Sequence, residues 1–210
     1  YIGIKYCSAV ANASVGLEIA LNALNIGKDD EVIVPSRSYI TTATSVLRVN
    51  AKPIFADIEN NSMNICVESI KSNINFKTKA IICVHLSGYP CDMNKIKKIA
   101  TKYNLKIIED CSQAHGAKID NKVVGSFGDI SVWSFCNDKI ISTGGEGGMV
   151  GCNNFKLYKK IWSFKDCGRS FDKALKKNNK IGYKWIYDSL GTNLRMTEMQ
   201  AVIGLAQLKQ

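Results

Sequence analysis

The sequence predicts an α/β fold in which helices cover a largely parallel sheet. Short runs rich in isoleucine and valine recur along the chain, and their apolar character is continuous rather than alternating, which is typical of strands covered on both faces. Segments with apolar residues at helical spacing lie between these runs. Because strands and helices alternate, we expect right-handed crossovers and a ligand site beyond the carboxyl ends of the strands.

The predicted elements follow in chain order. Strands are expected at EVIVP (31–35), KPIFADI (52–58), KAIICVHL (79–86), KIIED (106–110) and ISVWSF (130–135). Helices are expected in 14–27, in 92–104 with Asp92 as N-cap, and from a Thr197–Gln200 capping box to the chain end at Gln210. The predicted core faces of the first two helices are Leu17, Leu21 and Leu24, and Met93, Ile96, Ala100 and Tyr103. The polar segment 170–184 is expected to be an exposed loop.

Composition indicates one globular domain of 210 residues, 46% of them hydrophobic. The chain has neither an apolar run of about eighteen residues nor a signal-peptide pattern at its start, so we expect no membrane association. The eight cysteines are scattered singly, without a zinc-binding pattern. They predict free thiols in a reducing, cytoplasmic compartment.

The formal net charge of +10 raises the alternative of a nucleic-acid-binding domain. Arginine occurs only at Arg37, Arg48, Arg169 and Arg195, and the lysines are spread through the chain. Scattered lysines without arginine clusters are typical of a solvated surface. We therefore expect no nucleic-acid partner, while an anionic small substrate fits the charge.

A single lysine, Lys139, stands before the glycine run in SFCNDKIISTGGEGGMV (134–150). The stretch matches neither common phosphate-loop motif, because the lysine precedes the glycines. By itself Lys139 fits an exposed turn, and Asp110, at the end of KIIED, fits a solvated strand end. Together they meet two needs of pyridoxal phosphate, a lysine that can hold its aldehyde and an acid that keeps its ring nitrogen protonated.

A phosphate group favours a helix N-terminus with free N–H groups and nearby hydroxyls. Ala13 and Ser14 stand where the first helix begins, and Ser134 precedes Lys139 by five residues. Each has a simpler explanation, since Ser14 fits a helix cap and Ser134 an ordinary strand residue. Their joint occurrence favours a cofactor site.

The chain closely resembles the DegT/DnrJ/StrS family of nucleotide-sugar aminotransferases. The match runs nearly collinearly from about Ala9 to Gln210. It is carried by GKDDEVIVPSRSYITTATSVLRVNAKPIFADIE, TKAIICVHLSGYPCDMNKI, LKIIEDCSQAHGAKIDNKVVGSFGD, WSFCNDKIISTGGEGGMV and GTNLRMTEMQAVIG. The resemblance implies a three-layer sandwich with a mostly parallel central sheet, the large domain of a fold-type I pyridoxal phosphate enzyme. It also implies that 1–210 is this domain alone, truncated at both ends, without the smaller carboxy-terminal domain.

The resemblance assigns a role to each candidate site residue. Lys139 would hold the cofactor covalently and shuttle a proton, and Asp110 would pair with the pyridine nitrogen. Gln113 would donate to the ring oxygen and Tyr39 would stack on the ring. The phosphate would be bound by Ala13, Ser14 and Ser134, and by Asn193 of the neighbouring subunit in a homodimer.

The activity implied is transfer of an amino group from glutamate to a keto group of a nucleotide-linked sugar. The products of such enzymes enter surface polysaccharides or antibiotics. The retained Lys139 argues against the dehydratases of the family, which carry histidine there. Two positions depart from the family pattern, since Ala13 replaces a usual glycine and Tyr187 a frequent histidine. A non-catalytic regulatory relative and an inactive fragment remain alternatives.

Several other residues have open assignments. His115 fits either a supporting position behind Gln113 or a satisfied core histidine, and His85 is predicted to be structural. Arg195 fits a subunit boundary or an ordinary salt bridge. Trp133 and Trp162 are expected in the core.

Overall fold

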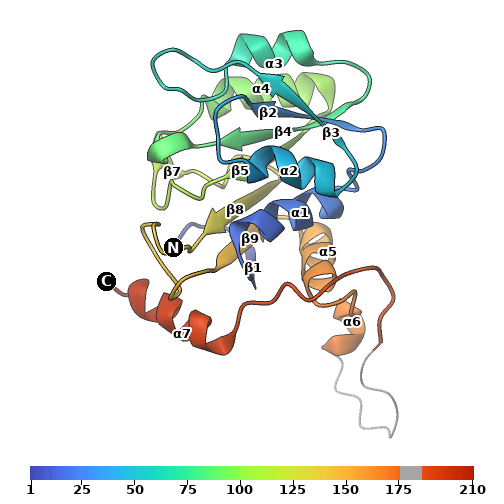
Figure 1. Cartoon of the computed structure of the whole chain (residues 1–210), viewed down its shortest axis with the longest axis vertical. Coiled ribbons are helices and arrows are strands. Elements are labelled where there is room, and N and C mark those ends of the chain that lie inside the picture. The colour runs from blue at the N-terminus through green and yellow to red at the C-terminus, as the bar shows by residue number, and fades with distance from the viewer. Residues whose placement is uncertain (176–185) are drawn as a thin grey trace, which may run out of the picture.

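In the computed structural model, which describes residues 1–175 and 186–210, helices cover both faces of a seven-stranded sheet (Figure 1). The strand order is β1-β9-β8-β5-β4-β2-β3. The strands are β1 (Tyr6–Val10), β2 (Glu31–Pro35), β3 (Lys52–Ala56), β4 (Thr78–Val84), β5 (Lys106–Asp110), β8 (Ile130–Ser134) and β9 (Gly148–Cys152). Strands β3, β2, β4, β5 and β8 pair in parallel, while β9 is antiparallel to β8 and to β1. The predicted three-layer α/β fold is confirmed.

The five predicted strands are all present, and the sequence interpretation missed four others. Strands β1 and β9 form the antiparallel edge of the sheet, where the glycines of β9 weaken the strand pattern. Strands β6 (Lys118–Ile119) and β7 (Lys122–Val123) make a hairpin turned by Asp120 and Asn121, both at positive φ. Strands of two residues are too short for hydrophobic periodicity to reveal.

Two apolar clusters hold the layers together. One joins the sheet to α1 (Ala13–Ala23), α2 (Thr41–Arg48) and α5 (Phe155–Lys165). The other joins the opposite face to α3 (Val67–Asn73) and α4 (Met93–Tyr103). Leu17 and Leu21 are buried in the first cluster with Leu24 packed against it, as predicted.

The predicted face of α4 is wrong at one position. Met93, Ile96 and Ala100 are buried, but Tyr103 is 43% exposed, and Ile99 packs in the core instead. Tyr103 is the last residue of the helix, and its ring lies 5.2 Å from the Lys102 ammonium, a cation–π contact that favours an exposed ring. The predicted Asp92 cap is confirmed, since its Oδ1 accepts the Lys95 N–H at 3.1 Å.

The carboxy-terminal predictions need two corrections. Helix α7 (Glu198–Gln207) begins with the predicted Thr197–Gln200 capping box but ends at Gln207, not Gln210. Its last carbonyls accept only tight i→i−3 bonds, from Lys209 and Gln210. The predicted loop 170–184 contains the short helix α6 (Phe171–Ala174), because Phe171 packs on Phe155, Tyr158 and Trp162. Residues 176–184 of that prediction lie outside the described residues.

Strand β5 sends neighbouring side chains to opposite layers. Ile108 packs in the cluster on the α1 side, and Ile107 in the cluster on the α4 side. Since side chains alternate along a strand, Asp110 faces the α1 side and Glu109 the α4 side. All eight cysteines are free, as predicted. No helix among the described residues is both long enough and apolar enough to span a bilayer.

Candidate functional site

A cleft of about 520 Å³ lies where the N-terminus of α1 meets the loops that follow β2, β4, β5 and β8. This is within the size range of small-molecule sites. The structure brings seven of the eight predicted site residues into its wall: Ala13, Ser14, Tyr39, Asp110, Gln113, Ser134 and Lys139. Asn193 is not among the lining residues. The position beyond the carboxyl ends of the strands agrees with the expectation from the α/β pattern.

The N-terminus of α1 forms one wall of the cleft. Asn12, and not Ser14, caps this helix, because Asn12 Oδ1 accepts the Val15 N–H at 3.0 Å. The Ser14 hydroxyl has no hydrogen-bond partner within the described residues, so it is available to a ligand. A Cβ on Gly148 would lie 2.7 Å from the Asn12 carbonyl carbon and 2.9 Å from the Ala13 nitrogen. Only glycine lets β9 approach the helix N-terminus this closely.

Asp110 and Gln113 form the floor of the cleft. Asp110 is buried, and burial raises the pKa of its carboxyl, although the Ser112 N–H donates to Oδ1 at 3.0 Å. Gln113 Oε1 accepts the Ser87 N–H at 2.6 Å. With its oxygen occupied in this way, the Gln113 amide presents its N–H₂ group as the donor for a ligand.

Lys139 lies in the connection between β8 and β9, with its side chain 17% exposed. Its Nζ donates to both carboxylate oxygens of Asp138, at 2.8 and 2.9 Å. This hydrogen bond lowers the pKa of Asp138. Sequence reasoning missed Asp138, and its position beside the lysine was the only signal. Ser134 Oγ accepts the Cys136 N–H at 3.3 Å, and Tyr39, 71% exposed, stands at the mouth.

Asn193 is exposed outside the cleft, on a segment that contacts the residue before the α1 cap. The Ala11 N–H donates to the Leu194 carbonyl at 2.9 Å. Asn193 Oδ1 accepts from Arg195 Nε at 3.0 Å, and Arg195 Nη1 lies 2.9 Å from Asp166 Oδ1. Arg195 therefore makes a salt bridge within the chain, one of its two predicted assignments.

The model of the DegT/DnrJ/EryC1/StrS aminotransferase family matches residues 1–210. The chain belongs to this family. It is 44% identical over 207 residues to the GDP-perosamine synthase of Escherichia coli O157:H7, a match that covers 99% of the chain and 54% of that relative.

Two solved structures are similar to the chain over nearly its whole length. The aminotransferase from Psychrobacter cryohalolentis is 50% identical, with a TM-score of 0.97 over 99% of this chain and 53% of its own. NtdA from Bacillus subtilis, solved with bound cofactor PMP, is 33% identical, with a TM-score of 0.88 over 100% of this chain and 45% of its own. The chain thus spans about half the length of the relatives it matches.

Four residues of this family member that the sequence left open do not line the cleft. His85 is fully buried, which confirms its structural assignment, and Trp133 is buried in a third apolar cluster. Trp162 is half-buried, with its ring edge-on to Phe171. His115 is not a satisfied core histidine. The Ser134 backbone lies near its ring, but no described residue meets either ring nitrogen in hydrogen-bond geometry, and burial lowers the pKa of His115.

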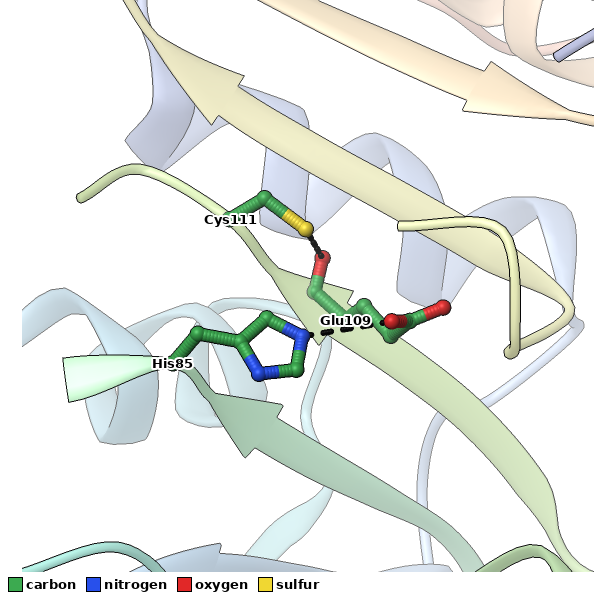
Figure 2. Close-up of side chains that lie close together, drawn as sticks. All are labelled: His85, Glu109 and Cys111. Carbon is green, nitrogen blue, oxygen red and sulfur yellow. Dashed lines mark hydrogen bonds and ion pairs between the residues drawn. The ribbon is translucent and has the colours of Figure 1, made fainter. Parts of the chain in front are cut away.

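Figure 2 shows a buried trio, His85, Glu109 and Cys111, whose ligand-type atoms lie within 4.8 Å of one another. Hydrogen bonds already occupy both ring nitrogens of His85 and both carboxylate oxygens of Glu109, the atoms that could bind a metal ion. His85 Nδ1 accepts the Cys91 N–H at 3.1 Å, and its Nε2 lies 3.2 Å from Glu109 Oε2. The Glu109 carboxylate also accepts three backbone N–H groups, and burial raises the pKa of the Cys111 thiol well above its usual range, whereas metal ligation needs the thiolate. The trio is a hydrogen-bonded anchor.

The residues of the cleft fit pyridoxal phosphate. Asp110 is a buried carboxylate without an ion-pair partner in the described chain, which is what a protonated ring nitrogen would supply. The α1 N-terminus offers N–H groups and the Ser14 hydroxyl for a phosphate. Lys139 lies in the same wall for a covalent link.

Proposed function

We propose that the chain is the cofactor-binding part of a pyridoxal phosphate-dependent aminotransferase. In this proposal the enzyme moves an amino group from glutamate to a keto group of a nucleotide-linked sugar. The observation that carries it is the convergence of Lys139, Asp110 and the α1 N-terminus on one cleft. When bound, pyridoxal phosphate supplies an electron-withdrawing ring and carries the amino group between the two half-reactions.

Each residue of the chain has a task that its position supports. Asp110 holds a proton at the ring nitrogen, because its carboxylate is buried and otherwise unpaired. Lys139 Nζ would hold the cofactor and then move a proton between a carbon atom of the cofactor and one of the substrate. For this, Lys139 would give up its hydrogen bonds to Asp138. Gln113 orients the ring by donating its N–H₂ group, and the Tyr39 ring covers one face and excludes water.

Ala13, Ser14 and Ser134 bind the phosphate at the positive end of α1. Asn193 lies outside the cleft of its own chain, which supports the proposal that it serves the phosphate of a second subunit in a homodimer. Arg195 Nε donates to the Oδ1 of this exposed asparagine and fixes its orientation. Activity would then require the dimer.

The nature of the sugar is inferred from the relatives. The E. coli relative is named for GDP-perosamine, an amino sugar linked to a nucleotide. A positively charged chain suits a diphosphate-bearing substrate, and eight free cysteines suit a reducing, cytoplasmic compartment. We place the products in surface polysaccharide or antibiotic biosynthesis.

The test is the visible absorbance of the purified chain with pyridoxal phosphate, before and after addition of glutamate. We expect a band that depends on Lys139 and shifts with glutamate. Lys139→Ala should lose the band and reduce amino transfer by at least ~1000-fold, the scale of an essential catalytic group, while circular dichroism stays unchanged. Lys97→Ala, an exposed lysine on α4, is the matched control. A mutant at Lys139 that keeps full turnover would refute the proposal, and a band that glutamate does not shift would favour a regulatory relative.

A further inference from the structure

The last two residues of β5 are both acids, and they face opposite layers of the molecule. Asp110 lines the cleft, while Glu109 is fully buried and faces the α4 side. Figure 2 shows the Glu109 side chain beside His85. Glu109 Oε1 accepts the N–H groups of Phe127 at 2.7 Å and Gly128 at 2.5 Å. Its Oε2 accepts the Gly125 N–H at 2.7 Å. One carboxylate thus anchors the loop before β8 to the end of β5.

His85 joins a second loop to this carboxylate. Its Nδ1 accepts the Cys91 N–H at 3.1 Å, so its ring proton is on Nε2, which donates to Glu109 Oε2 at 3.2 Å. The His85 backbone N–H donates to the Asp110 carbonyl at 3.1 Å. The loop that follows β4 is therefore attached to β5 by one bond from the His85 backbone and another from its side chain.

That loop also determines how Gln113 points. Its Ser87 N–H donates to Gln113 Oε1 at 2.6 Å, from a residue held at φ 53°. A serine at positive φ keeps this conformation only where its surroundings impose it. Asn64 contributes by accepting the neighbouring Leu86 N–H at 3.1 Å. The Ser87 bond occupies the oxygen of the Gln113 amide and leaves its N–H₂ group as the donor.

We propose that Glu109 and His85 are positioning residues for the cleft. They hold the end of β5 and the loop 85–88 together, and thereby set the places of the Asp110 carboxylate and the Gln113 amide. Supporting hydrogen bonds of this kind fix the geometry of ligand-binding groups in other sites. The inference rests on the proposed function for its effect on the cofactor, but its effect on the Ser87 loop requires no cofactor.

The variant that tests the pair is Glu109→Gln. The amide keeps the shape but has a single oxygen, and its NH₂ group would face N–H donors on one side. We expect the dissociation constant of pyridoxal phosphate to rise by ~10-fold or more, as when supporting hydrogen bonds are lost at other sites, and the pH midpoint of the cofactor band to move. In the cofactor-free chain, hydrogen exchange at Ser87 should accelerate ~10-fold or more.

Glu31→Gln is the matched control. Glu31 is a buried glutamate at the amino end of β2, and its Oε2 accepts from Asn75 Nδ2 at 2.7 Å. It should lower stability without changing cofactor affinity, pH midpoint or Ser87 exchange. In a second pair, His85→Phe should behave as Glu109→Gln, and His85→Gln, which can accept from Cys91 and donate to Glu109, should partly restore wild-type values.

The outcomes separate the inference from the proposed function. Unchanged affinity, pH midpoint and Ser87 exchange in Glu109→Gln and His85→Phe would overturn the inference. Equal effects in Glu109→Gln and Glu31→Gln would also overturn it, because a general loss of stability would then suffice. A wild-type chain that forms no cofactor band would refute the proposed function, and the exchange measurement would still decide the inference.

Discussion

Asp110 and Glu109 show how neighbouring residues of one type come to differ in chemistry. Both are buried carboxylates, but Glu109 accepts three backbone N–H groups and a bond from His85, whereas Asp110 accepts a single backbone bond from Ser112. Burial accordingly raises the pKa of Asp110. The alternation of side chains along β5 assigns one acid to the structure and the other to the cleft.

This difference predicts the effect of Asp110→Asn on stability. Because the folded pKa of Asp110 lies above its unfolded value, ionisation in the folded state is unfavourable, and the stability that this group contributes is lost as pH rises through the folded pKa. Asparagine does not titrate. In the cofactor-free chain, we expect the free energy of unfolding of Asp110→Asn to rise relative to that of wild type as pH rises. At neutral pH it should be higher than the wild-type value by on the order of 1 kcal/mol.

Urea unfolding of both proteins from pH 3 to 8 checks this expectation, and the variant should also fail to give the wild-type cofactor spectrum. A stability difference that does not change with pH would contradict the assignment.

At the scale of elements, the site depends on how closely β9 approaches α1. Gly148 is the first residue of β9 and packs directly on the peptide between Asn12 and Ala13. The proposed phosphate site is thus a junction of two elements that lie far apart in sequence. Among the glycines that follow Lys139, Gly148 is required at this position because a Cβ would meet the Asn12 and Ala13 backbone.

Gly148→Ala should therefore separate the two elements. We expect a loss of about 1–3 kcal/mol in the free energy of unfolding, the usual cost of overpacking, and weaker binding of pyridoxal phosphate. Gly27→Ala is the control, since a Cβ there meets only the Val49 carbonyl oxygen at an ordinary 3.5 Å. Thermal unfolding and absorbance titration measure both effects. Wild-type affinity in Gly148→Ala would show that the close approach is dispensable.

At the scale of the whole molecule, α7 exposes several large apolar side chains. Met199, Val202 and Leu205 are 77%, 65% and 60% exposed, and apolar residues gathered on one helix are typical of an interface. The same helix follows the segment that carries Asn193 and contacts the site through Gln200, whose Nε2 donates to the Glu146 carbonyl at 2.8 Å. This arrangement supports the proposed homodimer.

Val202→Glu should weaken that dimer, because a charge would be buried in the interface. By analytical ultracentrifugation, we expect wild type to sediment as a dimer of 23.1 kDa chains and the variant as a monomer. Cofactor affinity should fall by ~10-fold or more. Phe76→Glu, at an 85% exposed phenylalanine before β4, is the control and should leave the dimer intact. A dimer that survives Val202→Glu would place the interface elsewhere.

The sequence by itself determined the α/β layers and five strands of the sheet, because continuous apolar runs are local signals. Its lysine, acid and helix-start patterns also indicated Ala13, Ser14, Asp110, Ser134 and Lys139, which line the cleft, whereas Tyr39 and Gln113 were indicated only by the family resemblance. Only the tertiary structure decided that Asn12 caps α1 and that the Ser87 N–H donates to Gln113. The same structure decided that Asn193 lies outside the cleft of its own chain. It also decided that the trio of His85, Glu109 and Cys111 is a hydrogen-bonded anchor. These depend on contacts between segments distant in sequence, and a chain's local pattern carries no record of which backbone N–H will meet which carboxylate.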